Sequence, residues 1–140
     1  MDLIHTALLN PPNAVLEALL PADRLTLGKR RWRATAEDGR EFGFDLAEPL
    51  EDGAPFFHSG GTTYIIAQKP EPVIEVALGG PGESARLAWL IGNLHFSVEI
   101  TGATLRVAAD SAIQQMLERE QIAFSKVTRV FHPFHAAHPH

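Results

Sequence analysis

Residues 73–107 of this chain read VIEVALGGPGESARLAWLIGNLHFSVEITGATLRV, and this stretch decides the fold of the C-terminal half. It begins with a β-branched apolar run, Val73–Leu78, which predicts a strand. A loop rich in glycine and proline then leads into a helix predicted over Glu83–Leu94. The last part predicts a hairpin, because two short strands, Ser97–Ile100 and Thr104–Val107, flank a turn that contains glycine.

The residues that follow add a second helix and a last strand. Asp110 is predicted to cap the helix, in which Ile113, Met116 and Leu117 have the i, i+3, i+4 spacing of one apolar face. The last strand is predicted within Ile122–Phe131. The resulting order β-α-β-β-α-β is that of the ferredoxin-like fold, in which two helices cover one face of an antiparallel sheet.

The N-terminal half carries the signals of short strands separated by turns. Asp38-Gly39 lies between two alternating stretches and predicts a hairpin, since glycine tolerates positive φ. On the return strand Phe42, Phe44 and Leu46 recur with a period of two, which places one apolar face against a core. A second apolar strand is predicted at Thr62–Ala67, and a short helix at Ala14–Leu19.

A change of pattern divides the chain. Lys69-Pro70-Glu71-Pro72 interrupts the strands, because prolines cannot donate to a ladder and bias their neighbours to extended conformations. We therefore predict an α+β protein with an N-terminal all-β domain at residues 1–70. A ferredoxin-like domain is expected at residues 71–131, followed by a flexible histidine-containing tail at residues 132–140.

Composition limits what this chain can do. It has 140 residues, no cysteine and a formal net charge of -5. The absence of cysteine excludes disulfides, thiolate metal ligands and cysteine nucleophiles, and it fits a reducing compartment, so we expect a cytoplasmic location. The negative charge argues against a nucleic-acid partner, and no apolar run approaches the length of a membrane span. The basic run Gly28–Arg33 is interpreted either as a docking patch for an acidic partner or as a solvated turn and strand edge.

The first helix of the C-terminal half is apolar on nearly every side. One stripe contains Leu87, Leu90, Ile91 and Leu94, and a second contains Ala85, Ala88, Trp89 and Gly92. A two-layer fold covers only one of these stripes, and exposed apolar patches on small proteins usually mark subunit contacts. We therefore expect this helix to lie in a homodimer interface.

The seven histidines are unevenly distributed. His5, His58 and His95 stand alone, whereas the last nine residues contain His132, His135, His138 and His140. Imidazole suits nickel, copper and zinc at neutral pH. In a two-fold dimer, a histidine near the axis meets its own copy, so His95 could supply two ligands to one ion. A helix-terminal role for His95, bonded to the last carbonyl groups, and chance histidines in a disordered tail remain alternatives.

Motifs of catalysis are missing from the sequence. It has no His-Glu-x-x-His arrangement, no Gly-rich phosphate loop with its lysine, and no Gly-x-Ser-x-Gly elbow. Asp110 is the only acid near the expected metal site, and its interpretation as a helix cap is favoured. We therefore expect a protein that is not an enzyme.

The stretch AWLIGNLHFSVEI at residues 88–100 resembles the Gly-Asn-Arg-His signature of UreE urease accessory proteins. In that family the signature ends a helix of a ferredoxin-like domain and supplies the metal-binding histidine, which corresponds to His95 here. Leu94 replaces the usual arginine, which removes a cation but leaves the histidine. Some family members carry extra histidines where Arg106–Ser111 stands here, so a second peripheral site is not expected, and Asp110 is the one residue that could remain of it. Further segments resemble the family in the same order: Asp23–Leu27, Asp38–Leu46, Pro70–Val76 and Gln115–Leu117.

The resemblance implies a nickel metallochaperone that works as a homodimer. The ferredoxin-like domains would meet around paired His95 residues, and the tail histidines would complete the coordination of one nickel ion, with zinc and copper as further metals for the same ligands. The N-terminal domain would dock the urease apoprotein and other urease maturation proteins. The alternative is a metal-independent adaptor that binds a protein partner through its β domain.

Overall fold

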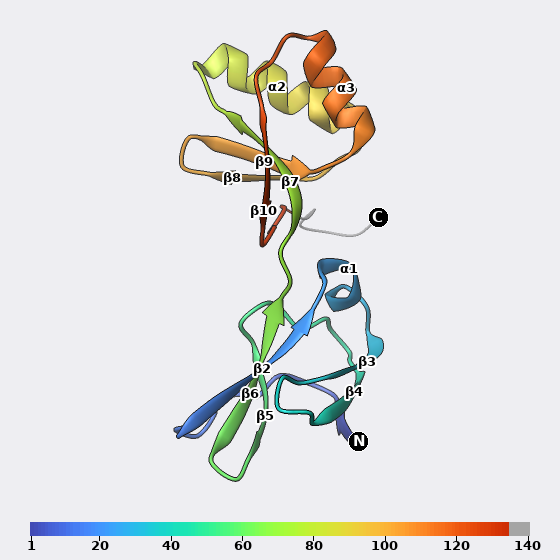
Figure 1. Cartoon of the computed structure of the whole chain (residues 1–140), viewed down its shortest axis with the longest axis vertical. Helices are drawn as coiled ribbons and strands as arrows, with labels where there is room; N and C mark the ends of the chain where they lie inside the picture. Colours follow the sequence, from blue (N-terminus) through green and yellow to red (C-terminus); the bar gives the residue numbers. More distant parts are fainter. Residues whose placement is uncertain (135–140) are drawn as a thin grey trace. The chain divides into compact units, whose positions relative to one another are not determined.

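The computed structural model describes residues 1–134 and divides the chain into two compact units, Met1–Lys69 and Pro70–His140 (Figure 1). The first unit consists of two three-stranded sheets and a one-turn helix. The second consists of a four-stranded sheet and two longer helices. The chain is therefore of mixed α and β class, as predicted.

Each sheet of the first unit combines an antiparallel hairpin with a parallel third strand. One sheet has the order β1-β4-β3 and the other the order β2-β6-β5. The elements of this unit are β1 (Asp2–Ile4), β2 (Leu16–Ala22), α1 (Arg24–Leu27), β3 (Arg31–Thr35), β4 (Glu41–Asp45), β5 (Pro55–Ser59) and β6 (Thr62–Gln68). The predicted hairpin is confirmed, because β3 and β4 pair antiparallel and Gly39 in their turn has a φ of 93°.

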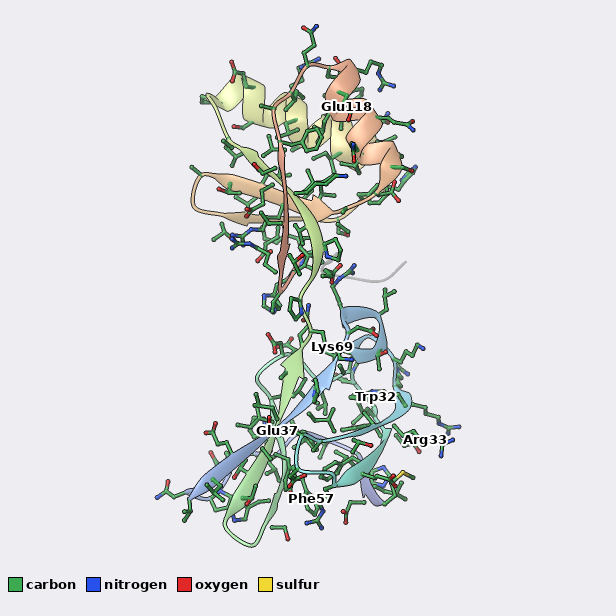
Figure 2. The ribbon with its side chains drawn as sticks, viewed as in Figure 1. Trp32, Arg33, Glu37, Phe57, Lys69 and Glu118 are labelled. Atoms are coloured by element: carbon green, nitrogen blue, oxygen red, sulfur yellow. The ribbon has the colours of Figure 1, made fainter. Side chains whose placement is uncertain are left out.

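Aromatic rings from both sheets form one core in this unit. Phe42 and Phe44 of β4 are buried, as their period of two predicted. The Phe42 ring meets Phe56 of β5 edge to face, with centroids 5.0 Å apart. Glu37 also joins the two sheets, because its backbone N–H donates to the Leu19 carbonyl and its carboxylate accepts from the Leu19 N–H, both at 2.9 Å (Figure 2).

The predicted helix at Ala14–Leu19 is wrong, since residues 16–22 form strand β2. This strand pairs in parallel with β6 over seven residues, from Leu16 opposite Thr62 to Ala22 opposite Gln68. Ala18, Leu20 and Ala22 are buried at alternate positions, which is the period of a strand. Pairing with a distant strand therefore outweighs the weak local preference of a short segment.

The second unit places two helices on one face of its sheet (Figure 1). Its elements are β7 (Glu71–Ala77), α2 (Pro81–Asn93), β8 (Val98–Thr101), β9 (Thr104–Ala108), α3 (Ser111–Arg119) and β10 (Ser125–Arg129). The sheet order is β10-β7-β9-β8, with every neighbouring pair antiparallel. The core contains Ile74 and Val107 from the sheet, Ile91 from α2, and Ile113 and Leu117 from α3.

The predicted cap of α3 is confirmed. The Asp110 side chain accepts a hydrogen bond from the Ala112 N–H at 2.8 Å. Ile113, Met116 and Leu117 are all buried against the sheet, as their spacing predicted. The carboxylate of Asp110 is therefore engaged at the start of the helix.

Candidate metal centre

His95 lies immediately beyond the C-terminal end of α2. Leu94 is the C-cap, and His95 follows it with a φ of 65°, in the left-handed region. Its backbone N–H donates to the Gly92 carbonyl oxygen at 2.9 Å, which satisfies one of the last free carbonyls of the helix. Glycine usually occupies such a position because it has no Cβ, and asparagine sometimes does because its short polar side chain can hydrogen-bond locally.

The imidazole of His95 projects into solvent, since the residue is exposed. Among residues 1–134 the backbone of His95, and not its ring, makes the hydrogen bond that ends α2. The alternative in which the ring bonds the last carbonyls is therefore not seen in the part of the chain that the structure describes. Both ring nitrogens are available to an external ligand, and histidine is the side chain that most often binds metal ions in proteins.

One face of α2 points away from the core of the second unit. Leu87 and Ile91 are buried beneath the helix, whereas Trp89 is 66% exposed. Ala85, Ala88 and Gly92, which share the second apolar stripe with Trp89, are exposed as well. The structure therefore leaves uncovered the stripe that ends three residues before His95.

The C-terminal segment after β10 runs back to the strand that follows His95. The Phe134 N–H donates to the Val98 carbonyl oxygen of β8 at 2.8 Å. The His132 N–H donates to the Glu99 Oε1 atom at 3.3 Å. Val98 is three residues beyond His95, so an extended chain of roughly 10 Å joins the two Cα atoms at most. The start of the histidine tail is thus attached close to His95 of the same chain.

The structure describes two of the five predicted metal ligands. His95 and His132 are both exposed and belong to the second unit, while His135, His138 and His140 lie outside the described residues. Within residues 1–134, no three His, Asp or Glu side chains gather in a group that could hold a metal ion. The described part of a single chain therefore offers separate imidazoles, which a metal site would have to combine with further ligands.

The two remaining histidines belong to the first unit and have protein partners. His5 Nδ1 lies 3.0 Å from the Asp45 carbonyl oxygen, and His58 Nδ1 lies 2.9 Å from Thr63 Oγ1. Both side chains therefore have structural roles within the first unit. Glu99 and Phe131 were not singled out in the sequence, because no local pattern indicates that a chain end will bind across a sheet.

Comparison with known proteins identifies the family. Residues 71–140 match the model described as UreE urease accessory protein, C-terminal domain. A protein of Microcystis aeruginosa named urease accessory protein UreE is 33% identical over 139 residues, which cover 97% of this chain and 87% of that protein. The chain belongs to the UreE family. The resemblance drawn from Gly92–His95 is therefore confirmed at the level of the family.

Two further UreE relatives cover different shares of the chain. Urease accessory protein UreE of Paracoccus denitrificans is 36% identical over 104 residues, which are 73% of this chain and 65% of that protein. Urease accessory protein UreE 1 of Brucella suis is 30% identical over 131 residues, which are 89% of this chain and 80% of that protein.

Members of the UreE family are accessory proteins and not enzymes, so the expectation from the missing catalytic motifs is confirmed. Within the described residues, no helix is both long and apolar enough to cross a membrane.

Proposed function

We propose that this UreE protein is a nickel metallochaperone that delivers nickel for assembly of the urease active site in the cytoplasm. The observation that carries the proposal is the exposed His95 imidazole, held in the left-handed region at the end of α2 without a described protein partner. Gln121 has the same conformation at the end of α3, with a φ of 58°, so the support comes from the exposed ring and not from its backbone. Imidazole is a suitable ligand for nickel, and also for zinc and copper.

The metal is held between two copies of the chain in this proposal. The uncovered stripe of α2, with Trp89 66% exposed, supports a homodimer built on this helix. A two-fold axis near the end of α2 would bring the two His95 rings to one ion. The tail histidines His132, His135, His138 and His140 would complete the coordination. Few protein ligands, some of them on a chain end, suit a carrier that must release its ion.

In this proposal, one unit binds metal and the other binds partner proteins. The order β10-β7-β9-β8 with both helices on one face supports a ferredoxin-like domain at residues 71–131, which binds metal and dimerises. The β-rich domain at residues 1–70 would dock the urease apoprotein and other maturation proteins. Arg31, whose side chain is 83% exposed, belongs to the basic run and is a candidate contact. Its ion pair with Asp45, at 3.1 Å, is exposed and contributes little to stability.

Nickel titration of the full chain by calorimetry tests the metal site. We expect one nickel ion per dimer, and a loss of at least tenfold in affinity when His95→Gly removes both imidazoles from the shared site. Glycine suits the backbone conformation of this position, so the variant removes the ligand without loss of the fold. Unchanged binding in His95→Gly would favour the metal-independent adaptor over the carrier.

Sedimentation of a Trp89→Arg variant tests the dimer. Because Trp89 is exposed in the chain, a charge there should leave the subunit folded but disrupt association, and nickel affinity should fall with it. The matched control is Leu25→Arg, at a residue of the first unit that is 72% exposed. A Trp89→Arg protein that stays dimeric, or a monomeric wild type, would contradict the proposed interface.

A further inference from the structure

The C-terminal segment passes over the sheet face that the helices leave open. Along β7, β9 and β8, the residues Ile74, Val107 and Val98 lie on the helix side, with Val107 in register with both Ile74 and Val98. Their neighbours Glu75, Arg106 and Glu99 therefore point to the opposite face. The His132 N–H bonds to Glu99 on that face, so the segment after β10 crosses it before it reaches β8.

A row of charged side chains fixes the position of Glu99. Arg106 Nε lies 2.6 Å from Glu75 Oε2, and Arg106 Nη1 lies 3.7 Å from Glu99 Oε1. The three side chains are only 13–18% exposed, which strengthens their interaction relative to an ion pair in water. Glu99 Oε1 is thus held where it can accept the backbone N–H of His132 at 3.3 Å. Phe131, which precedes this bond, is 2% exposed and is not part of the helix-side core.

The second attachment is made by the backbone of Phe134. Its N–H bonds to the Val98 carbonyl at the edge of the sheet, where a strand has unpaired groups that accept another segment. The Phe134 side chain is 60% exposed, so the residue is held mainly through its backbone. β10 and β8 are the two outer strands of the sheet, which are separated by roughly 14 Å across three strand spacings. The segment carries the chain over this distance, to the strand that follows His95.

We infer that Glu99, Phe131 and the Phe134 backbone are positioning residues, which hold the chain up to Phe134 close to His95 of the same chain and thereby raise the affinity of the shared metal site for the histidines that follow. This inference rests on the proposed function. With the segment attached, one peptide unit separates Phe134 from His135. When the segment is released from the sheet, the free chain begins after Arg129, six residues before His135. Effective concentration falls with about the 3/2 power of the free length, so release of the segment should lower affinity by roughly tenfold.

The sharpest test removes a single hydrogen-bond donor. Phe134→Pro eliminates the N–H that Val98 accepts, and Phe134→Ala is its matched control, since it keeps the N–H and loses the same exposed ring. Nickel titrations should give roughly tenfold weaker binding for Phe134→Pro and binding within about twofold of wild type for Phe134→Ala. Phe131→Ala should also weaken binding, and Phe131→Leu should restore much of it by filling the buried position.

The same substitution in a chain without tail histidines distinguishes positioning of the tail from a general structural effect on the metal site. In a full-length chain with His132, His135, His138 and His140 replaced by alanine, Phe134→Pro should cause no further loss, because no tail ligand remains to be positioned and the backbone N–H of residue 132 is kept. Equal losses in both backgrounds, or full affinity of Phe134→Pro in the native background, would overturn the inference. Unchanged binding after the four tail replacements would overturn it as well. The proposed function is tested separately, by nickel binding to His95→Gly. Weaker binding by His95→Gly together with full affinity of Phe134→Pro would overturn this inference and leave the proposed function standing.

Amide hydrogen exchange in the absence of metal supplies an independent readout. The His132 amide, which donates to Glu99, should exchange faster in Phe134→Pro than in Phe134→Ala, because the segment loses its hydrogen bond to the Val98 carbonyl. Equal exchange rates in the two variants would show that the Phe134 bond does not hold the segment, and this result would also overturn the inference.

Discussion

The backbone N–H of His95 bonds to the Gly92 carbonyl oxygen at 2.9 Å, and this bond ends α2 with His95 at a φ of 65°. The left-handed conformation costs a residue with a Cβ about 1–2 kcal/mol relative to the right-handed one. A helix end of this kind therefore favours glycine, and a histidine here lowers stability. Gln121 follows α3 in the same conformation, with a φ of 58° and its N–H bonded to the Glu118 carbonyl oxygen at 3.1 Å, so the backbone alone does not distinguish His95. What distinguishes this position is its exposed imidazole.

Substitutions of His95 should reveal that cost. We expect His95→Gly to raise the free energy of unfolding by up to about 1 kcal/mol, because relief of the left-handed strain exceeds the added freedom of the unfolded chain. His95→Val should lower it by about 1 kcal/mol or more, since a β-branched side chain fits this conformation poorly. Urea denaturation of the metal-free protein measures both. A His95→Gly protein much less stable than wild type would mean that the ring makes stabilising contacts.

The helix cap of α3 leads to a second prediction. Asp110→Ala removes the acceptor of the Ala112 N–H, so we expect the free energy of unfolding to fall by about 1 kcal/mol. Asp110→Asn should retain most of the stability, because an asparagine side chain caps a helix about as well. Nickel affinity should be the same in all three proteins. Weaker nickel binding by Asp110→Asn would instead assign the carboxylate to a metal site.

Local signals explain which parts of the fold could be predicted. The Asp38-Gly39 turn and the Asp110 cap each depend on a few neighbouring residues, and both are present in the structure. Strand β2 was mistaken for a helix because its seven residues are defined by their pairing with β6, more than forty positions along the chain. Strand β1 carries too little pattern in three residues to be recognised, although Leu3 and Met1 cover Gly43 of β4.

The candidate site could be predicted only in part, for the same reason. The apolar α2 and the histidine after it are visible in the sequence, and the exposed Trp89 fits the expectation that one stripe lacks a cover. The left-handed backbone of His95 could not be foreseen, because histidine is not the residue that signals such a turn. The attachment of Phe134 to Val98 joins residues 36 positions apart through backbone atoms, which leave no signal in the side chains.

The indole of Trp32 provides a third prediction. Its ring stacks on Phe44 with centroids 4.0 Å apart and an interplanar angle of 14°, while its Nε1 atom is buried without a hydrogen-bond partner in the described chain (Figure 2). An unpaired buried donor lowers stability, so Trp32→Phe should be neutral or stabilising by about 1 kcal/mol, since it keeps a ring and removes the N–H. Trp32→Ala should destabilise the protein by more than about 1 kcal/mol through loss of the stack. Thermal unfolding of the two variants and the wild type compares these effects. If Trp32→Phe loses as much stability as Trp32→Ala, the indole N–H forms a stabilising hydrogen bond.

The hydroxyl of Tyr64 leads to a prediction on acid stability. It donates to Asp38 Oδ2 at 2.6 Å, and this hydrogen bond holds the pKa of Asp38 below its ordinary value of 3.8. A carboxyl whose pKa is lowered on folding stabilises the protein at pH values above its unfolded pKa. That contribution is lost as the pH falls through the lower folded pKa. We therefore expect the free energy of unfolding to fall less steeply below about pH 4 in Tyr64→Phe than in wild type.

Urea denaturation at a series of pH values between about 5 and 2 measures this difference. Other carboxyls with lowered pKa values, such as Asp23 beside the Thr26 N–H, contribute equally to both proteins and cancel. Asp38→Asn supplies the control, because Tyr64→Phe should leave the pH dependence unchanged in a chain that has no carboxyl at this position. If the wild-type and Tyr64→Phe curves run parallel through this range, the hydroxyl does not lower the pKa of Asp38, and the acid sensitivity of the first unit has another origin.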